Sequence, residues 1–162
     1  MRRARAVRIS ALDAGLRLLA RRAHSRVELR RKLGRRGYDE EEIQGAVVRL
    51  AELGYLDDTA FAAGHVRRRS GSLGPLALTA ELAARGVDRQ AARGALAGFD
   101  RAAQVASATR LAERLCGSSR LAGYGELLDS VGAKLLRRGF SPGVAREACW
   151  AIWAGREHLP TA

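Results

Sequence analysis

Hydrophobic residues recur along the chain at the three- and four-residue spacing of helices that bury one face. In the first third of the chain these positions are Leu16, Leu19, Leu29, Leu33, Ile43, Val47 and Leu50. Glycine, proline and capping residues divide the rest of the sequence in the same way. The pattern predicts nine helices, at about 8–22, 26–36, 40–53, 58–70, 75–85, 89–97, 101–116, 123–138 and 142–155.

One short pattern occurs three times. It reads Leu33, Gly37, Tyr38, Asp39, Ile43 and Val47, then Leu82, Gly86, Val87, Asp88, Ala92 and Leu96, and more weakly Leu135, Gly139, Phe140, Ser141, Ala145 and Cys149. The copies are offset by 49 and 53 residues. A fixed period of this length is typical of repeat proteins, in which small units pack on their neighbours.

Each copy predicts a tight corner between two helices. Gly37 is expected just past a helix end, where the chain takes a positive φ. Leu33 before it and Tyr38 after it make the hydrophobic contact of a Schellman ending. Asp39 then caps the next helix, with Glu42 completing a capping box and Tyr38 packing on Ile43 as a hydrophobic staple. Gly86 and Gly139 are expected to act in the same way.

The segment Gly54 to Leu82 predicts a helix end followed by two helix starts. Gly54 ends one helix, and Asp57 is the expected N-cap of the next, with Leu56 and Phe61 as its staple. Pro75 opens a further helix. Ser25 and Glu28 form a second candidate capping box.

We therefore expect an all-α fold of three tandem three-helix, helix-turn-helix-like units. The expected boundaries are a basic arm at 1–8, units at 9–55, 56–98 and 99–157, and a tail at 158–162. Hydrophobic residues make up 47% of the chain and aromatic residues only 5%, which favours helices. No apolar run is long enough to span a bilayer and no signal peptide is evident, so a cytoplasmic location is expected.

The formal charge of +12 is unevenly distributed. Residues 1–36 carry a net +11 and residues 37–66 a net −6, while the remainder adds +7. A strongly basic chain with arginine-rich segments suits a polyanionic partner, because released counterions drive such binding. The alternative is an ordinary solvated basic surface.

The candidate partner- or DNA-binding residues lie on three of the predicted helices. They are Arg30, Arg31, Lys32, Arg35 and Arg36; Arg67, Arg68 and Arg69; and Lys134, Arg137 and Arg138. Because basic charge recurs from unit to unit, it could contact phosphates along a track. Charged helix ends that offset the helix dipole are the simpler explanation of the same residues, and the three consecutive arginines must point in different directions around their helix.

Two stretches resemble the RecX family of recombination regulators. They are ARRAHSRVELRRKLGRRGYDEEEI at 20–43 and the segment that contains GYLDDTAFA at 54–62, VRRRSGSLGP at 66–75 and AEL at 80–82. The likeness covers roughly residues 12–97 and rests on structural motifs. It implies an elongated, curved monomer that binds the groove of a RecA-type recombinase filament on single-stranded DNA and inhibits ATP hydrolysis, strand exchange and repressor cleavage.

The third unit departs most from this pattern. It has Ser141 in place of the aspartate and the small Ala145, and it is approached by the glycine-rich positions Gly117, Gly123 and Gly125. Its role in the groove is the least certain part of the resemblance.

Other functions find less support in the sequence. No Walker, GxSxG or HExxH motif is present, so neither catalysis nor a cofactor is predicted. No metal site is expected from the histidines, cysteines or aspartates. His24, His65 and His158 are isolated, Cys116 and Cys149 are far apart, and Asp57 and Asp58 are explained by capping. A DNA-reading helix at 39–53 is disfavoured because its first turn is acidic. A general DNA-binding module that needs no recombinase, and a repeat that binds only protein, stay open as alternatives.

Overall fold

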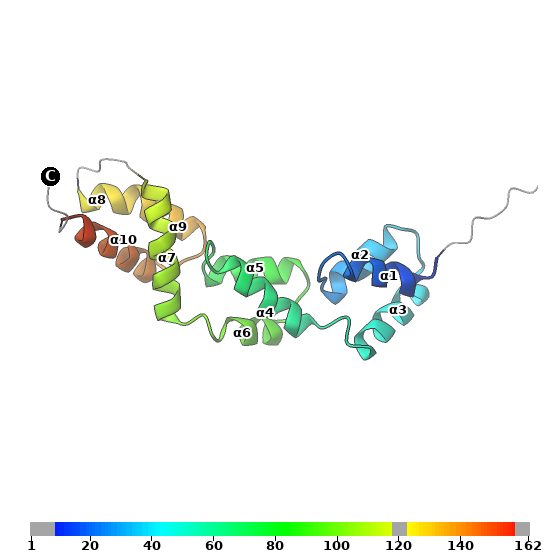
Figure 1. Cartoon of the computed structure of the whole chain (residues 1–162). Helices are drawn as coiled ribbons and strands as arrows, with labels where there is room; N and C mark the ends of the chain where they lie inside the picture. Colours follow the sequence, from blue (N-terminus) through cyan, green and yellow to red (C-terminus); the bar gives the residue numbers. More distant parts are fainter. Residues whose placement is uncertain (1–8, 118–122, 158–162) are drawn as a thin grey trace, which may run out of the picture.

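The protein forms a row of three helical units. The computed structural model describes residues 9–117 and 123–157, and these ranges contain helices and no strand. The helices are α1 (Ala11–Leu19), α2 (Arg26–Gly34), α3 (Glu40–Glu52), α4 (Asp58–Arg69), α5 (Pro75–Ala84), α6 (Arg89–Leu96), α7 (Arg101–Cys116), α8 (Tyr124–Leu127), a π-helical turn (Leu128–Gly132), α9 (Ala133–Arg137) and α10 (Pro142–Glu157). Figure 1 shows α1–α3, α4–α6 and α7–α10 as three successive groups in an elongated, curved molecule. The all-α tandem architecture is confirmed.

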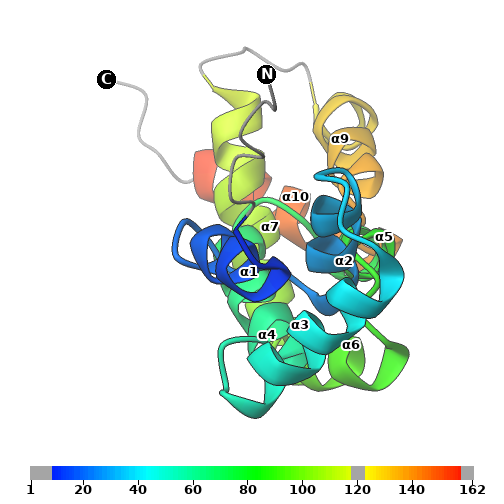
Figure 2. The same cartoon turned by 90° about the vertical axis from the view of Figure 1, so that its right-hand side faces the viewer.

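The predicted helix positions agree with the structure to within a few residues, except at the first helix. α1 ends at Leu19 rather than near residue 22, and Ser10 caps its start by accepting a hydrogen bond from Asp13 N at 3.0 Å. The predicted arm and tail lie outside the described residues. Viewed along the long axis, the units stand one behind another (Figure 2).

Glycine forms the expected corner in every unit. φ is +81° at Gly37, +76° at Gly86 and +83° at Gly139. In the first corner Tyr38 N donates to Leu33 O at 3.4 Å and Gly37 N to Gly34 O at 2.9 Å, which are the two bonds of a Schellman motif. The other two corners repeat both bonds. Gly54, at φ +76°, makes the same turn at the end of α3.

Most of the predicted caps are present. Asp39 and Glu42 form the capping box of α3, and Asp57 accepts from the backbone of Thr59 and Ala60 at the start of α4. Asp88 caps α6, through Ala91 N at 2.8 Å. Local sequence therefore determines where these helices begin.

Two local predictions were wrong. Ser25 caps α2, but the Glu28 carboxylate binds Arg22 and Arg85 instead of completing a capping box. Leu56 and Phe61 are buried in two separate hydrophobic clusters, so they do not pack together as a staple. In both cases a contact with a distant part of the chain replaces a local one.

The hydrophobic core is divided unequally among the units. One cluster belongs to α1–α3 and the turn that follows them, and it includes Leu29, Leu33, Ile43 and Leu50. In α1 its buried members are Ala11, Ala14 and Leu18, whereas the predicted Leu16 and Leu19 are only partly buried.

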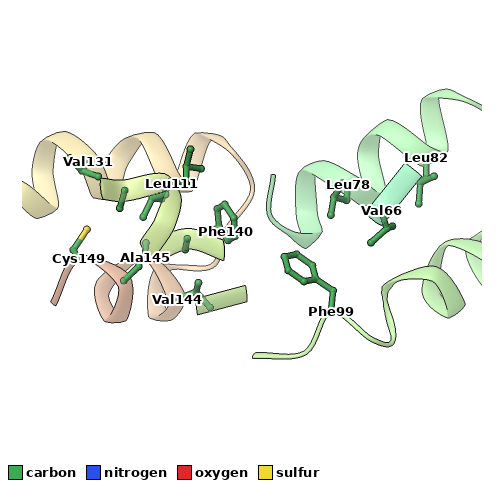
Figure 3. Close-up of a cluster of buried hydrophobic side chains, with 14 of the residues drawn as sticks. Val66, Leu78, Leu82, Phe99, Leu111, Val131, Phe140, Val144, Ala145 and Cys149 are labelled. Atoms are coloured by element: carbon green, nitrogen blue, oxygen red, sulfur yellow. The ribbon is translucent and has the colours of Figure 1, made fainter. Parts of the chain in front are cut away.

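A second cluster runs through units two and three without a break. It contains residues of α4–α6 together with residues of α7–α10. In Figure 3, Phe99 lies between Leu78 and Val66 on one side and Phe140 and Val144 on the other. Unit one therefore has its own core, and units two and three share one.

The middle helix of unit three contains the π-helical turn. The helical segment runs from Tyr124 to Arg137, close to the predicted 123–138, with Leu128–Gly132 in π conformation. A Cβ at Gly132 would lie 3.0 Å from Leu128 Cδ1 and 3.7 Å from Cys149 Sγ. The distance to α10 is that of an ordinary contact, so the crowding that favours glycine here comes from Leu128 within the same helical segment.

The middle helices of the three units follow one another end to end. At the junction of units two and three, Gly74 N donates to Arg138 O at 2.8 Å and Leu76 N to Gly139 O at 3.2 Å, so α5 starts where α9 ends. At the junction of units one and two, Ser25 Oγ donates to Arg85 O at 2.5 Å, so α2 starts where α5 ends. Figure 1 shows α9, α5 and α2 in this order. Carbonyls at one helix end are paired with donors at the start of the next.

The two junction glycines also allow close approach. A Cβ at Gly86 would overlap the side chain of Val27 from unit one, and a Cβ at Gly139 would overlap the backbone of Ala77 from unit two. A Cβ at Gly37 would meet nothing within 4 Å. Gly37 therefore needs glycine only for its backbone conformation, whereas Gly86 and Gly139 need it for packing as well.

We predict that Gly86→Ala destabilises the protein more than Gly37→Ala. Both substitutions place a side chain at positive φ, which costs roughly 1–2 kcal/mol, but only Gly86→Ala also pushes a methyl group into Val27. Urea unfolding of the two variants measures the difference. Val27→Ala should recover part of the loss in Gly86→Ala, and equal losses in both glycine variants with no recovery would contradict the junction packing.

Candidate nucleic-acid interface

A basic cleft of about 680 Å³ opens where unit one meets unit two. We call it the junction cleft. Its lining residues are Arg22, Ala23, Phe61, His65, Arg68, Arg69, Glu81 and Arg85. Arg22 comes from the turn after α1, while the remaining basic residues come from α4 and from the end of α5. The two units therefore build this cleft together.

Ion pairs hold most of the charged groups of the junction cleft in place. Glu28 accepts from Arg85 at 2.6 Å and from Arg22 at 3.1 Å. Glu81 accepts from His65 Nε2 at 2.7 Å and from Arg69 at 2.9 Å. Each carboxylate thus organises two basic groups. The Glu28–Arg85 pair also crosses between the units.

Both carboxylates favour their charged form. Burial opposes the ionisation of Glu28, but Arg22 and Arg85 outweigh it and hold the pKa of Glu28 below its ordinary value. The hydrogen bond from Arg69 is the main cause that lowers the pKa of Glu81, and His65 adds to it. Near neutral pH both carboxylates are therefore ionised.

Arg68 differs from its neighbours. Within residues 9–117 and 123–157 it makes no ion pair, and its guanidinium lies beside Gly64, where a Cβ would be 3.1 Å from Nη1. Four guanidinium groups thus surround the cleft against two carboxylates. The excess of positive charge makes it suitable for an anion.

The three consecutive arginines of α4 serve two different clefts, as their helical positions require. Arg68 and Arg69 line the junction cleft, but Arg67 lines a second cleft of about 340 Å³ between α4, α6 and α7, together with Arg110. Successive helical residues point about 100° apart. Basic charge therefore occupies clefts at both ends of unit two.

The other predicted binding residues are placed differently. Arg30 pairs with Glu40 and Gln44 within unit one. Arg31 donates to Ala84 O and Arg138 to Ser72 O, each at 3.4 Å across a junction between units. These two arginines support the junctions, and a role in binding stays a prediction for both.

The remaining predicted residues lie at the surface. Arg36 lines a small cleft with Arg17, Arg21 and Tyr38, and Lys32 is half-buried. Arg35, Lys134 and Arg137 are exposed. The structure does not gather the whole predicted set into one site, and it does not test what any of them binds.

The sequence pattern did not identify Arg22 or Arg85 as binding candidates. Arg22 stands in a turn, and Arg85 is a single basic residue in the least basic middle helix. Arg85 carried one usable signal, because it precedes Gly86 as Arg36 precedes Gly37 and Arg138 precedes Gly139. The arginine before a corner glycine lies at a unit junction in two of the three units.

The described residues contain no group of three or more histidine, cysteine or carboxylate side chains that could hold a metal ion. Cys116 and Cys149 are buried free thiols, and burial raises the pKa of Cys149 to about 11, with a smaller contribution from Cys116. None of the helices in the described ranges has the length and apolar character that a membrane crossing needs.

Comparisons with known proteins identify the first two units. Residues 11–50 match the family description "RecX, first three-helix domain", and residues 57–96 match "RecX, second three-helix domain". The chain belongs to the RecX family. It is 52% identical over 90 residues to the regulatory protein RecX of Xanthomonas axonopodis pv. citri (strain 306), and 43% identical over 90 residues to that of Stenotrophomonas maltophilia (strain K279a). These matches cover 55% of this chain in both cases, and the chain spans 56% and 55% of the two relatives.

Solved structures extend the likeness of fold beyond the matched units. The crystal structure of RecX from Lactobacillus salivarius superposes with a TM-score of 0.78 at 24% identity, covering 88% of this chain and 94% of that one. A second crystal structure of a regulatory protein RecX gives 0.75 at 23% identity, over 90% and 71% of the two chains. Coverage of this extent includes much of unit three, so the RecX-like fold is not limited to residues 11–96.

We predict that Glu28→Gln weakens the fold and reduces its sensitivity to acid. A carboxyl group whose pKa is lower in the folded state stabilises the protein above about pH 4.5, and this contribution is lost as the pH falls through the folded pKa. The loss at neutral pH should be on the order of 1 kcal/mol, since the arginine partners are part-exposed. Thermal unfolding of both proteins from pH 7 to pH 3 measures it.

Glu52→Gln is the matched control for this prediction. Glu52 pairs with Arg49 on the surface of α3, and both side chains are 56% exposed, so its removal should change stability little. If Glu28→Gln and Glu52→Gln have the same stability at every pH, the Glu28 ion pairs do not stabilise the junction.

Proposed function

We propose that the protein regulates a RecA-type recombinase, mainly as an inhibitor, by binding the recombinase filament on single-stranded DNA. The single observation that carries this proposal is the family membership of residues 11–96, whose curated relatives bear the name regulatory protein RecX. The whole activity is a proposal for this chain, because the sequence match covers only about half of each relative.

The shape and charge of the molecule are compatible with such a target. A filament is long and presents DNA phosphates together with protein surface. The units of this chain form an elongated row (Figure 1). Basic residues line clefts in unit one, between units one and two, and between units two and three. A track of basic groups can contact a polyanion at several points at once.

The proposed mechanism is mechanical rather than catalytic. Binding along the filament groove would connect neighbouring recombinase subunits and restrain the changes that accompany ATP hydrolysis, strand exchange and co-protease activity. The corner geometry supports this role, because each unit is fixed to the next through helix ends. We expect no cofactor, and a monomer as the active form.

A general DNA-binding module is the second candidate, and the excess basic charge favours it. Such a module would bind free DNA tightly with a steep salt dependence and would need no recombinase. A protein-only repeat would show little salt dependence. The ATP hydrolysis experiment below distinguishes the filament regulator from the DNA module, and the salt dependence of binding identifies a protein-only repeat.

We predict inhibition of filament ATP hydrolysis at substoichiometric amounts of the protein. One bound molecule that spans several recombinase subunits would restrain more than one active site. The measurement is ATP hydrolysis by recombinase assembled on single-stranded DNA, titrated with the protein before or after assembly. Absence of inhibition at one protein per recombinase, together with tight binding to free DNA, would favour the DNA module.

Replacing Arg67, Arg68 and Arg69 together with alanine should weaken this inhibition several-fold while the protein stays folded. Among the described residues, this triple variant removes only the ion pair between Arg69 and Glu81. The side chain of Arg69 is 46% exposed, so this loss should cost little stability. A matched control changes Arg49, Arg89 and Arg93, which are exposed arginines outside the clefts. Equal inhibition by both triple variants would remove the α4 arginines as contacts.

A further inference from the structure

The junction cleft presents basic groups that the fold itself does not neutralise. Glu28 and Glu81 together engage Arg22, Arg85, Arg69 and His65, and both carboxylates are fully used by these pairs. Arg68 points to the same space without an ion pair within the described ranges. Arg22, Arg68 and Arg69 are exposed and Arg85 is half-buried, so the excess positive charge of the cleft is accessible to a ligand from solvent.

We propose that the junction cleft binds one phosphate group of a nucleic-acid backbone through Arg68, with Arg22, Arg69 and Arg85 around it. Guanidinium groups suit this ligand because each offers parallel N–H donors to phosphate oxygens. The inference rests on the proposed function in one respect: the nucleic acid that supplies the phosphate is the single strand inside the filament. It goes beyond that function by assigning a ligand to one cleft and by including Arg22 and Arg85.

Two observations favour a phosphate of a nucleic acid over an acidic side chain of a protein. The cleft, at about 680 Å³, lies in the range of sites that hold whole small molecules, roughly 300–1,000 Å³. The cleft has room for a backbone phosphate with its flanking sugars, whereas a single carboxylate would leave most of it empty. Further basic clefts lie at Arg67 with Arg110 and at Arg17 with Arg36, which suits a polymer with repeated charges.

The position of the cleft gives the ligand a structural effect. Arg22 belongs to unit one, and Arg68 to unit two, so a phosphate between them connects the two units. This junction is otherwise held by few contacts, among them Glu28 with Arg85 and Ser25 with the Arg85 carbonyl. Phosphate binding should therefore stabilise the folded protein, because it favours the state in which both units are in place.

The test uses the full chain without any recombinase. Inorganic phosphate is titrated at constant ionic strength while thermal unfolding is followed, and binding of a single-stranded oligonucleotide is measured by fluorescence anisotropy at several salt concentrations. Arg68→Gln is compared with Arg93→Gln. Arg93 is also an exposed arginine in the last turn of a helix, makes no ion pair in the described ranges and lines no described cleft.

We expect Arg68→Gln to weaken phosphate binding about three- to tenfold, as loss of one charge-assisted contact would. The salt dependence of oligonucleotide binding should fall by about one unit of log–log slope. Arg93→Gln should leave phosphate binding unchanged. Equal phosphate affinity in both variants overturns the proposal.

Glu28→Gln gives a second test with the opposite sign. It frees Arg22 and Arg85 from their carboxylate, so phosphate and oligonucleotide should bind more tightly although the free protein is less stable. A merely structural cluster would show the loss of stability without the gain in affinity, and that result overturns the proposal.

Poly-glutamate distinguishes the remaining occupant. If Arg68→Gln weakens binding of poly-glutamate but not of the oligonucleotide, the cleft takes protein carboxylates and the proposal fails. Because no recombinase is present in these binding experiments, a negative result in them does not bear on the filament proposal. Likewise, absence of inhibition in the ATP hydrolysis assay does not bear on the phosphate site.

Discussion

The architecture depends on one recurring contact, in which the end of one middle helix meets the start of another. A helix end leaves backbone carbonyls without partners, and a helix start leaves N–H groups without partners. At Gly139 the two sets meet directly, since the amides of Gly74 and Leu76 donate to the carbonyls of Arg138 and Gly139. At Gly86 the Ser25 hydroxyl supplies the donor. The corner glycine is necessary because a side chain there would occupy the space of the next unit.

The same contact produces two different junctions because of what surrounds it. Around Gly139 the hydrophobic core continues from unit two into unit three, with Phe99 and Phe140 among its buried members (Figure 3). Around Gly86 the neighbours are the side chain of Val27 together with Glu28, Arg85 and the hydroxyl of Ser25, and the core of unit one is separate. The first junction is therefore stabilised mainly by apolar burial, and the second by ion pairs and hydrogen bonds. Salt and pH should act on the second more than on the first.

The sequence predicted what depends on near neighbours in the chain. Helix positions, the corner at Gly37 and the caps at Asp39 and Asp57 follow from residues within one or two turns of each other. The junctions could not be predicted in this way, because Ser25 and Arg85 are separated by 60 residues. The same distance explains the failed capping box, since Glu28 finds a stronger partner in Arg85 than in its own helix start. For the candidate site, sequence located the arginines of α4 but not Arg22, which joins them only through the junction.

The placement of arginines at helix ends has a consequence for binding. A basic residue in the last turn of a helix is stabilised by the helix dipole whether or not it binds anything, so Arg67, Arg68 and Arg69 need no ligand to explain their position on α4. In a chain whose units are joined through helix ends, however, the last turns are also where clefts form between units. Residues that stabilise a helix end are thereby brought to concave surfaces that neighbouring units share. The same arginine side chains can then both stabilise the fold and bind a polyanion. Arg68 differs from the others, because within the described ranges it makes no ion pair that binding would have to break.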